Sequence, residues 1–358
     1  MGCLDHFRYK YAFIDIWEEG MESEKYLGKV KVQEIWSTKY LGEIISSDGT
    51  NKENVAARKK RGFGTVKDIM NMLDTMCLGP YMFKKAIVLR DSMLVGTLLS
   101  CSEAWYNVSE ADLGQIEQVD KSLWCNLLEV ARTVPYDLLC LELGVEPLRF
   151  LIMRKRLINL QHILKQKESS LVRQFLITQS LNPRRKDWVT TIQQDLKQLE
   201  INLTFLEIQE MGKSTFKRMI KKKTKELAFR YLNQKKIDRN GKGREIIYCK
   251  LEMQSYLSEE YDYINNYERK LIFQLRTKMH FRIKSHFQNM HVDTICDGCR
   301  LSESTTEHTL ACPNLIEQNQ LITYIPRYRD LYGDDIEEQL YISRIVQDNL
   351  KRITELQE

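Results

Sequence analysis

Four residues in the C-terminal part of the sequence have the types and the spacing of a metal site. Cys296 and Cys299 form a C-x₂-C pair, and His308 and Cys312 follow as H-x₃-C. Two thiolates on one tight turn can hold a single ion, and residues four apart on a helix share a face. Three sulfurs and one imidazole nitrogen complete a tetrahedral set, so the pattern predicts one Zn²⁺ ion.

The predicted zinc site is structural, because four protein ligands leave no coordination position for water. Gly298 lies inside the C-x₂-C pair, where backbone freedom would help the turn. Two alternatives remain open, namely four unrelated residues in a helical domain and a redox C-x₂-C motif. The βαβ pattern that usually accompanies the redox motif is not visible around it. No catalytic residue is predicted.

A second motif, Tyr332-Gly333-Asp334-Asp335, has the Y-x-D-D form of polymerases that copy RNA. In those enzymes the aspartates hold Mg²⁺ and lie at the turn of a strand hairpin between apolar segments. Here the motif follows the polar stretch "PRYRD" and precedes an apolar stripe with helical spacing. Asp334 and Asp335 are therefore predicted to be acids at the start of a helix, where the helix dipole favours them.

Three basic segments precede the metal motif: a helix at 213–232, a loop at 239–245 and a helix at 266–287. Lys and Arg side chains can neutralise phosphates, and Phe281 and Phe287 could stack on unpaired bases. The alternative is that these are solvated faces of ordinary helices, with Phe281 in the core. The net charge of +5 permits an acidic partner without demanding one. The residues expected to contact nucleic acid are Lys217, Arg218, Lys221, Lys222, Lys225, Arg239, Lys242, Arg244, Arg276, Lys278, Arg282 and Lys284.

The composition favours a mainly α-helical protein with a substantial core. Of the 358 residues, 43% are hydrophobic, and only 16 Gly and 6 Pro argue against a turn-rich β fold. Nine cysteines, an odd number, and the absence of an apparent secretory signal predict an intracellular protein of the nucleus or cytoplasm. The most apolar stretch, 86–101, is interrupted by Arg90 and Asp91, so no membrane association is expected.

The fold predicted from these patterns is a helical bundle with a small N-terminal strand pair and a small C-terminal zinc module. Alternating residues at 26–49 predict the strands, and the turn signal "SSDG" ends them. Pro135 is predicted to start a helix that Gly144 ends, and Pro147 starts the next one. The expected domains are a strand segment at 1–50, a helical bundle at 51–180, a basic helical connector at 181–290, a zinc knuckle at 291–325 and a terminal helix at 326–358.

Residues 38–314 resemble the C-terminal half of the reverse transcriptase of non-LTR (LINE-like) retrotransposons. The segment "KYLGEIISSDG" within 38–62 is similar to one that follows the catalytic palm in that family. Residues 98–128 resemble its "GSExW" segment and the following thumb helix, although Cys101 and Ala104 depart from that pattern. Residues 134–164 look like the next helical segment, and residues 296–313 like the terminal Cys-Cys-His-Cys module.

The resemblance implies a thumb-like region that grips a template–primer duplex and a zinc knuckle that contacts RNA or target DNA. It places Tyr40, Leu41 and Gly42 near the primer terminus. It does not extend to the fingers and palm, because only 39 residues precede Tyr40 and residues 12–17 hold a single aspartate. The expected partners are RNA, DNA or both, with a retrotransposon-encoded protein as a further partner.

The sequence therefore predicts a nucleic-acid-binding fragment of a reverse transcriptase, with one structural zinc and no polymerase activity of its own. One rival is an active RNA-directed DNA polymerase whose palm is supplied by another chain or by upstream sequence. A second rival is a helical scaffold for protein interactions, in which zinc only fixes the C-terminal region. A decayed reading frame without a selected function also stays open.

Overall fold

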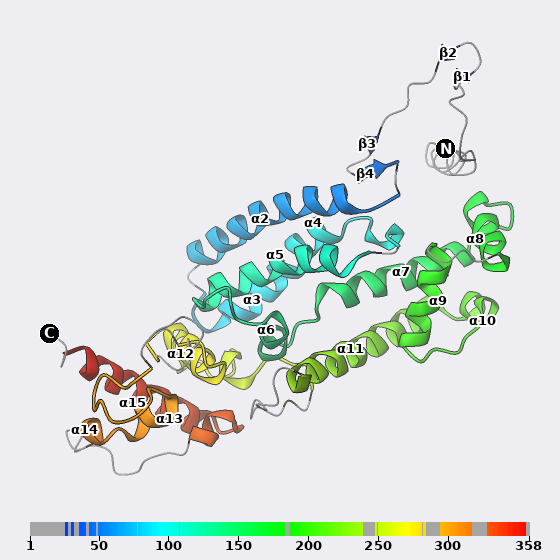
Figure 1. Cartoon of the computed structure of the whole chain (residues 1–358). Helices are drawn as coiled ribbons and strands as arrows, with labels where there is room; N and C mark the ends of the chain where they lie inside the picture. Colours follow the sequence, from blue (N-terminus) through cyan, green and yellow to red (C-terminus); the bar gives the residue numbers. More distant parts are fainter. Residues whose placement is uncertain are drawn as a thin grey trace. The chain divides into compact units, whose positions relative to one another are not determined.

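The computed structural model describes residues 26–27, 30–31, 36–40, 43–47, 49–76, 78–106, 108–182, 187–238, 248, 250–280, 282–283, 294–316 and 328–355. Within them the chain is mainly helical, with small antiparallel strand pairs near the N-terminus and a Cys/His cluster near the C-terminus, which confirms the predicted fold class. Figure 1 follows the chain from the blue strands to the red C-terminal helix.

The strands are β1 (Tyr26–Leu27), β2 (Val30–Lys31), β3 (Ser37–Tyr40) and β4 (Glu43–Ser46). The helices are α2 (Lys52–Thr75), α3 (Met82–Leu89), α4 (Val95–Leu99), α5 (Glu110–Leu128), α6 (Tyr136–Leu143), α7 (Leu148–Leu164), α8 (Leu171–Leu181), α9 (Trp188–Gln198), α10 (Phe205–Glu210), α11 (Lys213–Asp238), α12 (Asn266–Arg276), α13 (Thr306–Ala311), α14 (Pro313–Ile316) and α15 (Ile336–Glu355). Shorter turns include the π-helical η2 (Arg90–Leu94) and the 3₁₀ turns η3 (Ser102–Ala104) and η6 (Tyr328–Tyr332).

The strands form two antiparallel pairs, β1 with β2 and β3 with β4. In the second pair Ser37 lies opposite Ser46 and Tyr40 opposite Glu43. The side chain of Asn54, in the first turn of α2, accepts from the Ile44 N–H at 2.8 Å and donates to the Ile44 carbonyl at 2.9 Å. Because these bonds satisfy edge groups of β4, they join the strand pair to the start of the helical region.

The chain divides into two compact units that are each built from separated segments. The first unit contains residues 1–58, 99–114 and 151–224, and the second contains 59–98, 115–150 and 225–358. The chain passes between them within α2, α4, α5, α7 and α11. The five consecutive domains expected from the sequence stay a prediction.

In the first unit, α7 is fixed to its neighbours by paired polar groups. The buried Arg156 guanidinium donates to the two carboxylate oxygens of Asp195 on α9, at 2.8 and 3.0 Å. Gln161 donates through Nε2 to the carbonyls of Ile208 and Met211, both at 3.0 Å. The rotation of α7 about its axis is therefore set by bonds to α9 and to the end of α10.

In the second unit, buried charges are paired in two networks. Arg90 donates to both carboxylate oxygens of Asp120, and the Tyr136 hydroxyl donates to the same carboxylate at 2.6 Å. Glu142 accepts from the Tyr256 hydroxyl at 2.7 Å and from the Arg276 guanidinium. Arg276 follows Glu142 by 134 positions in the sequence. Such pairing offsets the large cost of burying isolated charges.

The predicted helix boundaries are confirmed around α6. Pro135 is the N-cap of this helix, and Gly144 is its C-cap with a φ of 66°. A Cβ at Gly144 would lie 2.1 Å from the Met253 nitrogen, so both the left-handed backbone and the close approach require glycine. Leu148 begins α7 directly after Pro147, as the sequence indicates.

Gly62 lies within the continuous helix α2, and a Cβ there would lie 2.6 Å from a Leu98 methyl group, so this glycine allows close packing. One sequence-based expectation about helices needs correction. The helix expected at 266–287 ends at Arg276. Lys278 adopts a left-handed φ of 55° and the Met279 N–H donates to the Gln274 carbonyl, which is the Schellman pattern without its usual glycine.

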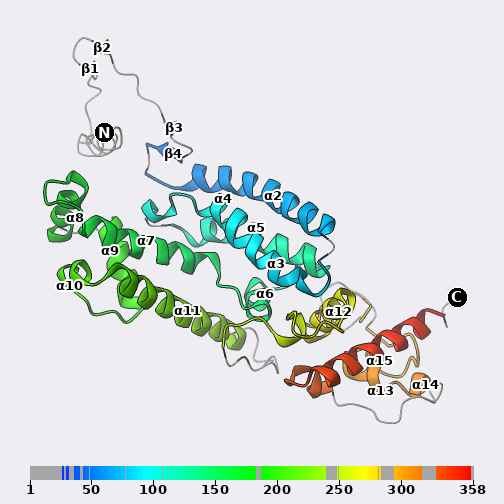
Figure 2. The same cartoon turned by 180° about the vertical axis from the view of Figure 1, so that it is seen from behind.

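Helices α12 and α13 and the turn η6 pack against α15 within the second unit. Figures 1 and 2 show α13 beside α15 from opposite sides. The apolar stripe of α15 includes Ile336, Leu340, Ile342 and Val346, which are all buried. This long helix therefore supports the segment that carries the Cys/His cluster.

Candidate functional site

The four predicted ligands lie together in the structure. Their donor atoms, three Sγ atoms and one ring nitrogen, are all within 4.8 Å of one another. The Sγ atoms of Cys296 and Cys312 are 4.0 Å apart, and Cys299 Sγ lies 3.2 Å from His308 Nε2. Tetrahedral zinc, with Zn–S bonds of about 2.3 Å, separates two sulfurs by about 3.8 Å. The cluster could therefore bind a metal ion of this kind with little adjustment.

Cys296 and Cys299 are placed by a short hairpin. Ile295 forms a β-bridge with Glu303, and the Cys296 N–H donates to the Ser302 carbonyl at 2.8 Å. Between the two bridged residues the Arg300 N–H donates to the Cys296 carbonyl at 2.9 Å and closes the turn. Both thiols consequently point to the same side of the knuckle.

His308 and Cys312 are placed by the short helix α13. Thr305 caps this helix, because its hydroxyl accepts from the His308 N–H at 2.9 Å. Cys312 is the C-cap, one helical turn after the histidine. From α15, Asn349 donates to the Thr309 carbonyl at 2.8 Å, and Ile353 packs against the three thiols. The long helix thus fixes α13 and covers the apolar side of the cluster.

The pKa shifts of the cluster residues are those expected of a site that binds a cation. Burial and the neighbouring Cys296 raise the pKa of the Cys312 thiol to about 12. Burial also opposes ionisation of Cys299, but backbone N–H groups of Leu301 and Ser302 outweigh it and lower the pKa of that thiol. Burial lowers the pKa of His308, which keeps its imidazole in the neutral form that binds metals. Three adjacent thiolates need a nearby positive charge to coexist.

The strained backbone of the knuckle is at Arg300, which has a φ of 57°, and Gly298 is not among the described residues with positive φ. Gly298 instead faces the cluster: a Cβ there would lie 3.6 Å from the sulfurs of Cys296 and Cys312. Its carbonyl accepts from Asn314 at 2.9 Å. The sequence predicted that the turn needs backbone freedom at Gly298, but the residue with the left-handed backbone is Arg300.

The Y-x-D-D stretch lies at the start of α15, as the sequence predicted. The Asp335 carboxylate accepts from the Glu338 N–H at 3.2 Å, and α15 begins at Ile336. The Gln339 side chain donates to the Gly333 carbonyl at 2.6 Å. Asp334 and Asp335 are both exposed beside this helix end and do not belong to a strand hairpin. Asp335 caps α15, and Asp334 directly precedes it.

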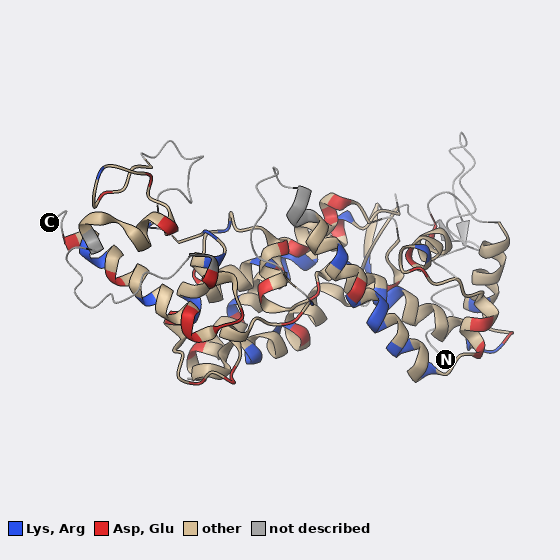
Figure 3. Ribbon diagram, turned by 90° about the horizontal axis from the view of Figure 1, so that it is seen from below, with Lys and Arg blue, Asp and Glu red and all other residues tan. Residues whose placement is uncertain are grey.

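Five exposed basic residues of α11 project from one side of the helix. Phe216, Ile220 and Thr224 are fully buried on the opposite side. The exposed members of the predicted contact set on this helix are Lys217, Arg218, Lys221, Lys222 and Lys225. Figure 3 shows basic and acidic residues interspersed along the described ribbon.

Other predicted contact residues have different outcomes. Lys278 and Arg282 are exposed after α12. Tyr40 ends β3, where its backbone pairs with Glu43, and nothing further is described of its side chain. Several predicted positions lie outside the described residues: Arg239, Lys242, Arg244, Lys284, Leu41 and Gly42, together with the stacking candidates Phe281 and Phe287.

Arg276 is a correction to the predicted contact set. It is only 3% exposed, and its Nε lies 3.3 Å from both carboxylate oxygens of Glu142. Its Nη1 donates to the Leu331 carbonyl at 2.7 Å. The guanidinium is therefore committed to the core, where it joins α6, α12 and η6, and it cannot reach a phosphate.

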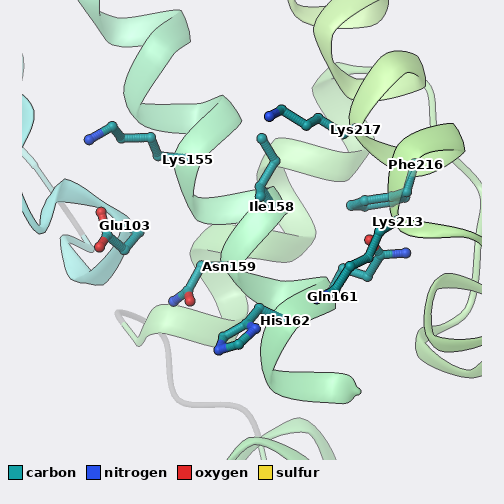
Figure 4. Close-up of a pocket in the computed structure, with 9 residues that line it drawn as sticks. All are labelled: Glu103, Lys155, Ile158, Asn159, Gln161, His162, Lys213, Phe216 and Lys217. Atoms are coloured by element: carbon teal, nitrogen blue, oxygen red, sulfur yellow. The ribbon is translucent and has the colours of Figure 1, made fainter. Parts of the chain in front are cut away.

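The structure also contains a pocket that the sequence did not indicate. It has a volume of about 420 Å³ and lies in the first unit. Its lining comes from η3, α7 and the first turns of α11, as Figure 4 shows. Because these three segments are far apart in the sequence, no local pattern could have revealed it. The lining residues are Glu103, Lys155, Ile158, Asn159, Gln161, His162, Lys213, Phe216 and Lys217.

Comparisons with known proteins do not identify the chain: no family model, curated protein or solved structure matches it. Within the described part of the chain, no helix has both the length and the apolar character required to cross a bilayer.

Proposed function

We propose that this protein binds RNA or single-stranded DNA through the exposed basic face of α11 and holds one structural Zn²⁺ ion. The observation that carries this proposal is the first half of α11. Residues 213–225 include seven basic side chains and no acidic one. An ordinary solvated helix face mixes both signs of charge, whereas a phosphate-binding face does not.

The dimensions of this face suit a nucleic-acid strand. The exposed side chains from Lys213 to Lys221 extend over eight residues, or about 12 Å at 1.5 Å per residue. The four exposed basic side chains in this stretch can each neutralise one phosphate, so the face suits about four phosphates of a strand. Binding of this kind is electrostatic and should weaken steeply as salt is added.

Zinc is the proposed ion because three thiols and one imidazole at these separations match its tetrahedral preference. In the proposed site Cys296, Cys299, His308 and Cys312 would hold the ion and join the knuckle to α13. The ion would neutralise thiolates that otherwise repel one another. Metal analysis of purified protein should give about one zinc per chain, and Cys299→Ser should lower that ratio.

The sequence resemblance to non-LTR retrotransposon reverse transcriptases supports the same proposal. In that family the corresponding helical segments and terminal knuckle contact nucleic acid. We do not assign polymerase chemistry to this chain, since Asp335 caps α15 and Asp334 directly precedes it at the start of that helix. Primer extension by the purified protein, alone and with a palm-containing partner, would reveal a contribution to a polymerase.

A second candidate function, a scaffold for protein interactions, is favoured by the surface of α8. This short helix exposes four large apolar side chains, Leu171, Phe175, Ile177 and Leu181. Such a surface can bind an apolar partner. A scaffold would retain its protein partner in the presence of excess RNA. A nucleic-acid-binding protein would instead release its labelled RNA when excess unlabelled RNA is added.

A filter-binding titration tests the main proposal. A labelled RNA or single-stranded DNA of about 20 nucleotides would be titrated at 50 and 200 mM salt. We expect measurable affinity at the lower concentration and a loss of roughly 50-fold at the higher one, if four phosphates are contacted with a slope of about −0.7 per contact. Absent or salt-insensitive binding would refute the proposal.

A further inference from the structure

The pocket of the first unit is built by rigid elements and opens to solvent. Asn159 and His162 are on α7, Lys213 and Lys217 are on the first two turns of α11, and Glu103 is in η3. In Figure 4 the α7 residues stand between Glu103 on one side and the α11 residues on the other. A volume of about 420 Å³ is in the range of roughly 300–1,000 Å³ that is typical of small-ligand sites.

Several polar groups that line this pocket are free to bind a ligand. The Glu103 carboxylate, the Asn159 amide and the Lys213 and Lys217 ammonium groups have no hydrogen-bond or ion-pair partner among the described residues. Gln161 is only 4% exposed, and its Nε2 donates to two carbonyls, so this lining side chain is held in one position.

The balance of charge favours an anion. Lys155, Lys213 and Lys217 line the pocket together with one carboxylate. Lys155 donates to the Leu99 carbonyl at 2.6 Å, which is a neutral acceptor, so its positive charge is not cancelled there. The 26-residue helix α11 also begins at Lys213, and its first-turn N–H groups add a positive potential.

Glu103 narrows the chemical class of the expected ligand, because it requires hydrogen-bond donors in addition to an anionic group. An ionised carboxylate can only accept hydrogen bonds, and a fully ionised phosphate has none to donate. A ligand that satisfies both Glu103 and the lysines must carry a phosphate together with O–H or N–H donors. A nucleotide has both, through its sugar hydroxyls or its base edge. Ile158, whose side chain is partly exposed, supplies an apolar contact for the base or the sugar.

We propose that this pocket binds one nucleotide unit of a bound strand. Its phosphate lies at Lys213 and Lys217, near the start of α11, and its sugar or base donates to Glu103 and contacts Asn159. The proposal rests on the proposed nucleic-acid binding and names the site that fixes a strand on α11. The other exposed basic residues of α11 then contact the phosphates of the strand without recognising its bases.

Fluorescence anisotropy with a labelled 12-nucleotide RNA tests this site. The pocket variant Lys213→Ala/Lys217→Ala is compared with Lys67→Ala/Lys85→Ala, which removes two exposed lysines of the second unit. We expect the pocket variant to lose affinity by about tenfold and its salt slope to fall by about 1.4, for two lost phosphate contacts. The control should change neither value.

The variant Glu103→Ala is a second test, because the two possible roles of Glu103 predict opposite changes in RNA affinity. If Glu103 only repels the strand, its removal strengthens RNA binding; if it accepts from the nucleotide, removal weakens binding by about three- to tenfold. Competition separates the ligand sources: adenosine monophosphate should displace the RNA at concentrations where inorganic phosphate does not. Thermal unfolding of each variant checks that the fold is retained.

The outcomes distinguish this inference from the proposed function. If the wild-type protein binds no RNA, the proposed function fails. If the wild-type protein binds RNA and the pocket variant matches the control, only the pocket is excluded. Stronger binding by Glu103→Ala, or equal competition by phosphate and the nucleotide, would also overturn the pocket assignment.

Discussion

Replacement of Arg276 by methionine distinguishes a core residue from a nucleic-acid contact. The change keeps much of the side-chain volume and removes the guanidinium. Glu142, whose side chain is completely buried, would then keep only neutral hydroxyl donors from Tyr248 and Tyr256. Breaking a buried ion pair costs about 3–5 kcal/mol, and the two remaining donors favour the lower end of that range. The lost bond to the Leu331 carbonyl adds about 1 kcal/mol.

Urea unfolding of the zinc-loaded protein would measure the cost. We expect Arg276→Met to lower the free energy of unfolding by about 4 kcal/mol. The double variant Glu142→Gln/Arg276→Met should recover part of that loss, because no uncompensated charge remains buried. RNA affinity, measured well below the unfolding range, should match that of the wild type. Unchanged stability together with weakened RNA binding would refute the core role of Arg276.

Three smaller predictions follow from backbone, packing and protonation. Gly62→Ala should destabilise the protein by about 1–2 kcal/mol through overpacking, whereas Gly64→Ala, with open space around it, should stabilise it by about 0.5–1 kcal/mol, as urea unfolding would show. Arg300→Gly should relieve the left-handed backbone and tighten zinc binding about two- to fivefold in a chelator competition. Burial lowers the pKa of His280 to about 4, so the unfolded state binds its proton first; stability should fall as the pH drops from about 6.5 to 4, and His280→Gln should reduce this dependence.

The metal cluster could be predicted from sequence because its information is local. The spacing of Cys296, Cys299, His308 and Cys312 is set by one hairpin and one helical turn, so residue types and intervals were sufficient to place the four ligands together. The boundaries of α6 were predictable for the same reason, since Pro135 and Gly144 encode them directly. Local signals of this kind require no knowledge of distant partners.

Features that depend on distant partners could not be predicted. The exposed or buried state of Arg276 is decided by Glu142, and a basic residue in a basic helix gives no sign of that pairing. The end of α12 was missed because Lys278, which is not glycine, adopts the left-handed conformation. The pocket was missed because η3, α7 and α11 contribute to it from three separate segments.

The supporting role of α15 at the metal cluster was also not visible in the sequence. Its helical stripe was recognisable, but the bond from Asn349 to the Thr309 carbonyl and the packing of Ile353 on the thiols depend on the folded chain. The same helix explains the Y-x-D-D stretch, in which Asp335 caps its first turn. A motif that suggests metal chemistry in isolation thus has a structural role here.

The salt dependence of RNA binding by an α11 variant tests the central claim most directly. In this variant Lys217, Arg218, Lys221 and Lys222 are all replaced by glutamine, and the control replaces the exposed residues Lys67, Lys85, Lys167 and Lys197. Four lost phosphate contacts should reduce the slope of log affinity against log salt by about 2.8, and the control should keep the wild-type slope. Equal slopes for the variant, the control and the wild type would contradict the assignment of α11 as the nucleic-acid-binding face.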